Sequence, residues 1–181
     1  MASQTETKKT PETGALTPDE DGVVDFLSGA DTKPVNSAMY DADGNYTGGR
    51  SSEELDSLAD DPEHRGSKRD SDIKKGRHER YVGLSLEESG KLAGPIVRDT
   101  SGAAEFFDAN GQAWDVKSFN SHYPSSSGGY SLAHCMSMIN KELKKGENII
   151  LDTTNLYEEH MEELINELEE LGLMDWILVW P

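Results

Sequence analysis

Apolar positions follow regular spacings in the second part of the chain, from about residue 76 onward. Two stretches repeat them every three or four residues, which is typical of amphipathic helices, and these are 130–145 and a segment that begins at Asn155. A capping-box pattern at Ser85 to Glu88 predicts a further short helix, which ends at Gly94. Short apolar runs predict five strands, at 95–98, 103–108, 112–119, 148–151 and 176–180. The expected fold is therefore α/β, in the order α-β-β-β-α-β-α-β.

Residues 1–75 differ in composition from the rest of the chain. They hold few large apolar side chains and many Gly, Ser, Asp and Glu residues, so they cannot bury enough surface to offset the entropy of ordering. We therefore predict a disordered acidic tail at 1–75 and one folded domain at 76–181. No apolar run approaches the ~20 residues that a spanning helix needs, so no membrane insertion is expected. The chain also starts without the pattern of a signal peptide.

A β-hairpin between residues 103 and 119 carries the strongest chemical signal. Asn110 and Gly111 both tolerate the positive φ that a tight turn requires. With a three-residue loop, Phe106 faces Trp114 and one face of the hairpin is apolar, whereas a two-residue loop would place Phe106 among charged side chains. The first register is therefore preferred. In that register the other face holds the charged residues, which are Glu105, Asp115 and Lys117.

The preferred register places Glu105 directly across from Asp115. Two opposed carboxylates repel, so a cation is expected between them. Mg²⁺ or Mn²⁺ fits, because Mg²⁺ favours a few carboxylates together with water and phosphate oxygens. Lys117, on the same face as Asp115, can then hold a scissile phosphate or steady the attacking water.

This succession of an acid, a hairpin and Asp-x-Lys resembles the nuclease motif of the PD-(D/E)xK superfamily, with Glu105 in the place of the first acid. Residues 105–117 alone carry that resemblance. The motif departs from the family in three respects: its first acid is Glu, no Pro precedes this acid, and its second acid is Asp. The first six predicted elements have the order of a restriction-endonuclease-like core, α-β-β-β-α-β, to which a C-terminal helix and strand are added.

A wider segment, which includes Gly-Glu-Asn-Ile-Ile-Leu-Asp-Thr at 146–153, is similar to C-terminal toxin domains of bacterial polymorphic and contact-dependent inhibition systems. Together the two resemblances imply a metal-dependent endonuclease that hydrolyses phosphodiester bonds in DNA or in RNA such as tRNA. Glu105 and Asp115 would hold the metal, and Lys117 would stabilise the developing charge. The resemblances also imply an antibacterial toxin with a cognate immunity protein. Such a toxin is made in the bacterial cytoplasm and delivered into a target cell by a secretion or injection system, here through the N-terminal tail.

Charge argues against a broad basic surface for nucleic acid. Residues 1–75 carry nine basic and seventeen acidic side chains, which gives −8, and residues 76–181 carry eight and eighteen, which gives −10 and a total of −18. Basic side chains near the hairpin can still act locally, because charges farther apart than ~8 Å are largely screened. Two alternatives stay open. One is a non-catalytic acidic binding protein, such as a nucleic-acid mimic or an adaptor, and the other is a metal-independent ribonuclease that uses His122 or His134.

Four further residues are weighed as helpers of the site. Glu88 is a candidate for an extra helical carboxylate, although its capping-box spacing already accounts for it. His122 and His134 are candidates for phosphate contacts. Cys135 is the only cysteine and has apolar neighbours on a predicted helix, so we interpret it as a packed thiol and not as a nucleophile.

Overall fold

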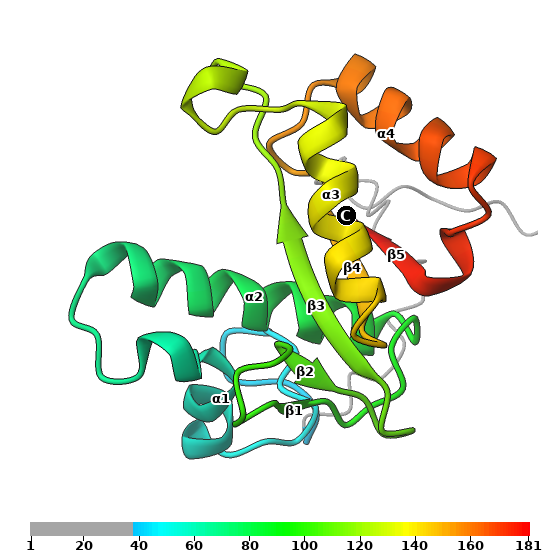
Figure 1. Ribbon diagram of the computed structural model, residues 1–181. Coiled ribbons are helices and arrows are strands. Elements are labelled where there is room, and N and C mark those ends of the chain that lie inside the picture. Colours follow the sequence, from blue (N-terminus) through cyan, green and yellow to red (C-terminus); the bar gives the residue numbers. More distant parts are fainter. Residues whose placement is uncertain (1–37) are drawn as a thin grey trace, which may run out of the picture. The chain divides into compact units, whose positions relative to one another are not determined.

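The computed structural model describes residues 38–181, which form a mixed five-stranded sheet with helices on both faces (Figure 1). The strands lie side by side in the order in which they occur along the chain. The first three are antiparallel neighbours, and the last three are parallel. The bounds of the strands are β1 Val97–Arg98, β2 Phe106–Phe107, β3 Ala113–Ser118, β4 Asn148–Asp152 and β5 Ile177–Trp180.

Helices cover the two faces and divide the core between them. The bounds of the α-helices are α1 Ser52–Ala59, α2 Asp70–Glu88, α3 Leu132–Leu143 and α4 Glu158–Glu170, and short 3-10 turns occur at Pro62–His64, Ser125–Ser127 and Met174–Trp176. Successive residues of β4 point to opposite faces. Ile150 packs in one core with Val82 of α2, whereas Ile149 and Leu151 pack in the other with residues of α3 and α4. Among the described residues, no helix combines the length and the apolar character that crossing a membrane requires.

The predicted order of elements from residue 95 to residue 181 is confirmed, with shorter strands than expected at β1 and β2. The helix predicted to begin at Ser85 is wrong, because Ser85 to Glu88 are the last residues of α2. The pattern of a capping box is present there, but Glu88 accepts a hydrogen bond from the Tyr40 hydroxyl, and the helix continues through Ser85. The last helix begins at Glu158 and not at Asn155.

The folded part begins earlier than the predicted boundary. Residues 38–75 contain α1 and the first turns of α2, so a boundary at 75 falls inside a helix. Leu58 of α1 is 3% exposed and belongs to the core on the α2 face. The prediction of a disordered tail is therefore wrong for 38–75, and residues 1–37 lie outside the described residues.

Ionic contacts hold this early segment, which explains why its low apolar content was misleading. The guanidinium of Arg50 donates to both oxygens of Glu87, at 2.9 and 2.7 Å, and both side chains are buried. The same guanidinium donates to the backbone oxygen of Ile96 at 2.9 Å, and Tyr46 donates to Glu87 at 3.1 Å. A segment can thus be ordered by a few well-paired charges as well as by apolar burial.

We expect Leu58→Ala to lower the free energy of unfolding by roughly 2–5 kcal/mol, because it opens a cavity in a closed core. Ser57→Ala, on the exposed side of the same helix, is the matched control and should change it by no more than about 0.5 kcal/mol. Urea unfolding followed by circular dichroism measures both. Equal, small effects would mean that α1 is not part of the cooperative unit.

Candidate functional site

The hairpin has the register predicted from the sequence, since Phe106 lies opposite Trp114. Its loop has three residues: the Asp108 N–H donates to the Gln112 oxygen at 3.0 Å, and the Gly111 N–H donates to the Asp108 oxygen at 2.9 Å. Gly111 has a φ of 80°, which residues other than glycine rarely adopt. The turn chemistry therefore fixes which side chains of the two strands meet.

Glu105, which directly precedes β2, meets Asp115 of β3. The Glu105 Oε2 accepts a hydrogen bond from the Val116 N–H at 2.8 Å, so the carboxyl lies along the edge of β3. Burial, and then the hydrogen bond and the charge of Asp115, raise the pKa of Glu105 to about 9. Asp115 is itself 5% exposed. The two carboxyl groups therefore share one partly desolvated site, where a second negative charge is unfavourable.

Lys117 completes the predicted trio. Its ammonium contacts the Asp115 carboxylate and lies 3.5 Å from the Glu142 Oε1. Burial opposes the charge on Lys117, but Asp115 and Glu142 outweigh it and raise the pKa of the ammonium. The structure thus brings Glu105, Asp115 and Lys117 together around one point, with the lysine charged.

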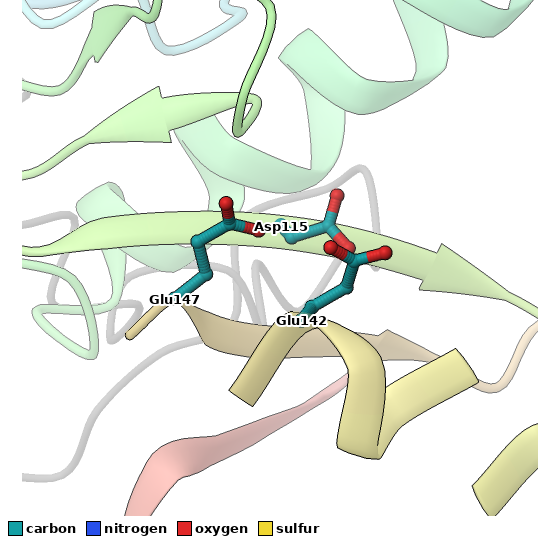
Figure 2. Close-up of side chains that lie close together, drawn as sticks. All are labelled: Asp115, Glu142 and Glu147. Atoms are coloured by element: carbon teal, nitrogen blue, oxygen red, sulfur yellow. The ribbon is translucent and has the colours of Figure 1, made fainter. Parts of the chain in front are cut away.

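Two further buried acids, which are not among the predicted site residues, lie at the same point. Figure 2 shows the carboxylates of Asp115, Glu142 and Glu147 pointing toward one another. One oxygen from each lies within 4.8 Å of the others, and this buried cluster could hold a metal ion. Glu142 is on α3 and Glu147 directly precedes β4. Glu147 is 5% exposed, and its Oε2 makes no hydrogen bond to any described residue.

The charges of the cluster are not balanced by its own lysines. Burial raises the pKa of Glu147 to about 7, and the Asp115 and Glu142 carboxylates act in the same direction while Lys145 opposes it. Lys145 contacts Glu142, and the mostly exposed Lys141 lies 3.6 Å from the same carboxylate. Four acids therefore face three lysines, and they are Glu105, Asp115, Glu142 and Glu147. One negative charge is in excess, and a proton on Glu105 or a divalent cation would relieve it.

The site opens into a cleft of about 570 Å³, lined by residues of α2, α3 and β3. Glu105, Asp115, Lys117 and Glu142 lie in its wall. Basic side chains surround them despite the acidic chain as a whole, and these are Lys75, His78, Arg98, His134, Lys141 and Lys145. Several of these charges are paired with acids of the same wall, so the more exposed Lys141 and Lys145 are the ones best placed to meet a phosphate.

The other predicted helpers are placed differently. His134 lines the cleft, whereas His122 does not and instead packs edge-on against the ring of Tyr157, with centroids 4.9 Å apart. Glu88 is exposed and accepts a hydrogen bond from Tyr40, so it takes no part in the cluster.

A different acid of α2 lies in the cleft in place of Glu88. This is Glu79, which pairs with Arg98 and with Lys75, each at 3.1 Å. Cys135 is fully buried in the α3 core, and burial raises the pKa of its thiol, which confirms the interpretation as a packed thiol.

Glu142 left one signal in the sequence. It follows the buried Cys135 and Ile139 by seven and three residues, so it occupies the apolar side of α3, where a charge requires partners. Glu147 left no such signal, because it lies in the connection between α3 and β4.

Known proteins do not assign this site to a family. The functional evidence is therefore the chemistry of the cleft itself. No protein-family model matches the chain, and no match was found among curated proteins or solved structures.

Proposed function

We propose that the protein is a metal-dependent nuclease that hydrolyses phosphodiester bonds in DNA or RNA. One observation carries the proposal: the carboxyls of Glu105, directly before β2, and of Asp115, on β3, meet beside the ammonium of Lys117 in the wall of a cleft. These are the residues that the resemblance to the PD-(D/E)xK superfamily implies. The order α2-β1-β2-β3-α3-β4 supports a restriction-endonuclease-like core, with α4 and β5 as additions.

The donor set fits a hard divalent cation, Mg²⁺ or Mn²⁺. Glu105 and Asp115 would hold it, and Asp115 is shared with the pair Glu142 and Glu147 on the side of β4. The buried Glu147 Oε2 has no hydrogen-bond partner among the described residues, and a bound cation would give it one. When bound, such an ion neutralises phosphate charge and lowers the pKa of a bound water.

The protein side chains bind and orient the phosphodiester. Lys117 is placed to stabilise the charge that develops on the phosphoryl oxygens. Lys141 and Lys145 are 64% and 42% exposed at the wall of the same cleft, so they can contact the phosphates on either side of the scissile one.

Cleavage by the purified full chain tests the proposal. We expect plasmid DNA, total tRNA or both to be cut with Mg²⁺ or Mn²⁺ and to stay intact in excess EDTA. Cleavage of tRNA in EDTA would favour the metal-independent ribonuclease, for which His134, and not His122, is the candidate that lines the cleft. Binding of a partner without cleavage under any condition would favour the acidic binding protein.

The toxin role is part of the same proposal and depends on the sequence resemblance. It includes an immunity protein that neutralises the nuclease and a delivery system that transports it. Induced expression in a bacterial host should stop growth, and Asp115→Asn should restore it, since Asp115 is central to the cluster. Growth arrest by the variant at equal protein levels would contradict a toxin that acts through this site.

A further inference from the structure

A histidine and a buried aspartate form a pair on the α2 side of the cleft. The His78 Nε2 lies 2.7 Å from the Asp152 Oδ2, although the two residues are 74 positions apart in the chain. Asp152, the last residue of β4, is 1% exposed, whereas the His78 side chain is 40% exposed and lines the cleft. The pair therefore joins a buried anion to an accessible imidazole.

Asp152 is held as an anion by its other contacts. Its Oδ2 accepts from the Ser118 hydroxyl at 2.7 Å, and its Oδ1 accepts from the Thr154 N–H at 3.0 Å and contacts the Thr154 hydroxyl. Burial works against the charge, but the hydrogen bonds from Thr154, Ser118 and His78 outweigh it and lower the pKa of Asp152. A fixed carboxylate of this kind orients an imidazole and stabilises positive charge on its ring.

The orientation leaves one ring nitrogen available. With Nε2 directed at Asp152, Nδ1 is the remaining polar atom, and no hydrogen bond from residues 38–181 reaches it. Trp180 holds the ring edge-on, with centroids 5.7 Å apart. An acid and an aromatic ring thus hold the imidazole of His78. This side chain lines the cleft, and its Nδ1 remains available for a ligand.

We propose that His78 donates the proton that the leaving oxygen takes up when the phosphodiester is cleaved, an inference that rests on the nuclease function proposed above. The position of His78 supports this role. Asp115, Glu142 and Lys117 line the same cleft as His78, with Glu142 on α3 and His78 on α2. In an in-line displacement the attacking and leaving oxygens lie on opposite sides of the phosphorus. If the water attacks from the side of the carboxyl cluster, the leaving oxygen faces α2.

The step balances with water as the only co-reactant. The water oxygen forms the new bond to phosphorus and releases a proton to solvent. The bond from phosphorus to the leaving oxygen breaks, and that oxygen takes the Nδ1 proton of the doubly protonated His78 ring, which becomes neutral. The ring regains a proton from solvent, so the products are an alcohol and a phosphomonoester.

Two substrates separate proton donation from a structural role. The leaving hydroxyl of a nucleic acid needs a proton, whereas the 4-nitrophenolate of bis(4-nitrophenyl) phosphate leaves without one. We expect His78→Gln to lower kcat/KM about 100-fold on the nucleic acid that the wild type cleaves. On the activated diester the loss should be no more than about threefold, because the acid is not required there.

Matched variants complete the test. Lys74→Gln, on an exposed position of the same helix, should leave both rates unchanged, and Lys117→Ala should lower both. A second readout does not depend on the activated diester: free imidazole should restore nucleic-acid cleavage to His78→Ala without changing its melting temperature.

Four results would overturn the proposal. Equal losses of His78→Gln on the two substrates, or full activity on nucleic acid, would remove His78 from the proton-donor role while the nuclease stands. Absence of imidazole rescue in a folded His78→Ala protein would do the same. A wild-type protein that cleaves neither substrate with Mg²⁺ or Mn²⁺ would overturn the nuclease function and this inference together.

Discussion

Lys117→Ala is expected to lower metal-dependent cleavage of nucleic acid by at least about 100-fold, which is the usual effect of removing one preorganised donor from a charge-stabilising site. Lys117 is the ammonium that contacts Asp115 at the wall of the cleft, and no other lysine contacts that carboxylate among the described residues. Initial rates at saturating Mg²⁺ measure the effect. Lys144→Ala, on an exposed position outside the cleft, is the matched control and should retain full activity.

The same variant should keep its metal, which distinguishes lost catalysis from a lost site. Lys117 and a divalent cation would compete for Asp115 and Glu142, so removal of the lysine leaves these carboxylates free for the ion. We therefore expect Mg²⁺ to raise the melting temperature of Lys117→Ala at least as much as that of the wild type. Undiminished cleavage by Lys117→Ala would contradict the proposed role, and so would a loss of activity that merely follows unfolding.

The hairpin could be predicted because its determinants are local. Asn110 and Gly111 set the turn, and the alternation of Phe106, Trp114 and the acids admits only one register that keeps the apolar residues together. Local sequence alone therefore predicts that Glu105 lies opposite Asp115. The helix and strand order after residue 95 followed for the same reason, since each element carries its own periodicity.

The remaining part of the site is formed by long-range contacts that periodicity does not encode. Glu142 and Glu147 reach Asp115 because the crossover through α3 returns the chain to β4, beside β3. His78 and Asp152 meet only after α2 has packed on the sheet. A single sequence shows which residues have useful chemistry, but it does not show which distant ones are brought together.

The early segment was misjudged for a different physical reason. Low apolar content predicts disorder for residues 38–75, yet Arg50, Glu87 and Arg98 are buried in ion pairs that connect this segment to α2 and β1. A buried and well-paired arginine contributes nothing to a hydrophobicity count. Glu79 is likewise a buried acid that no sequence pattern indicates, whereas the patterned Glu88 is exposed.

Glu105→Gln is expected to stabilise the metal-free protein above about pH 7 and to abolish cleavage. The sign follows from the pKa of Glu105, which folding raises from 4.5 to about 9. Between these values the folded protein holds a proton that the unfolded chain has released, so its stability falls as the pH rises, by at most ~1.4 kcal/mol per pH unit. Below the lower value the contribution is fully present. Glutamine removes the titration and can still accept the hydrogen bond from Val116.

Urea unfolding at pH values of about 5, 6.5 and 8, with and without Mg²⁺, measures this effect. Without metal, the stability of Glu105→Gln should vary less with pH than that of the wild type and should exceed it at the highest pH. With Mg²⁺ the wild type should become the more stable of the two. Its Glu105 carboxylate then binds the cation, so the repulsion from Asp115 is replaced by a stabilising interaction. Glu88→Gln changes an exposed carboxyl outside the cleft and should leave the response to Mg²⁺ unchanged. If Mg²⁺ stabilises Glu105→Gln and wild type equally, Glu105 is not a ligand, and the cation is held by Asp115, Glu142 and Glu147 alone.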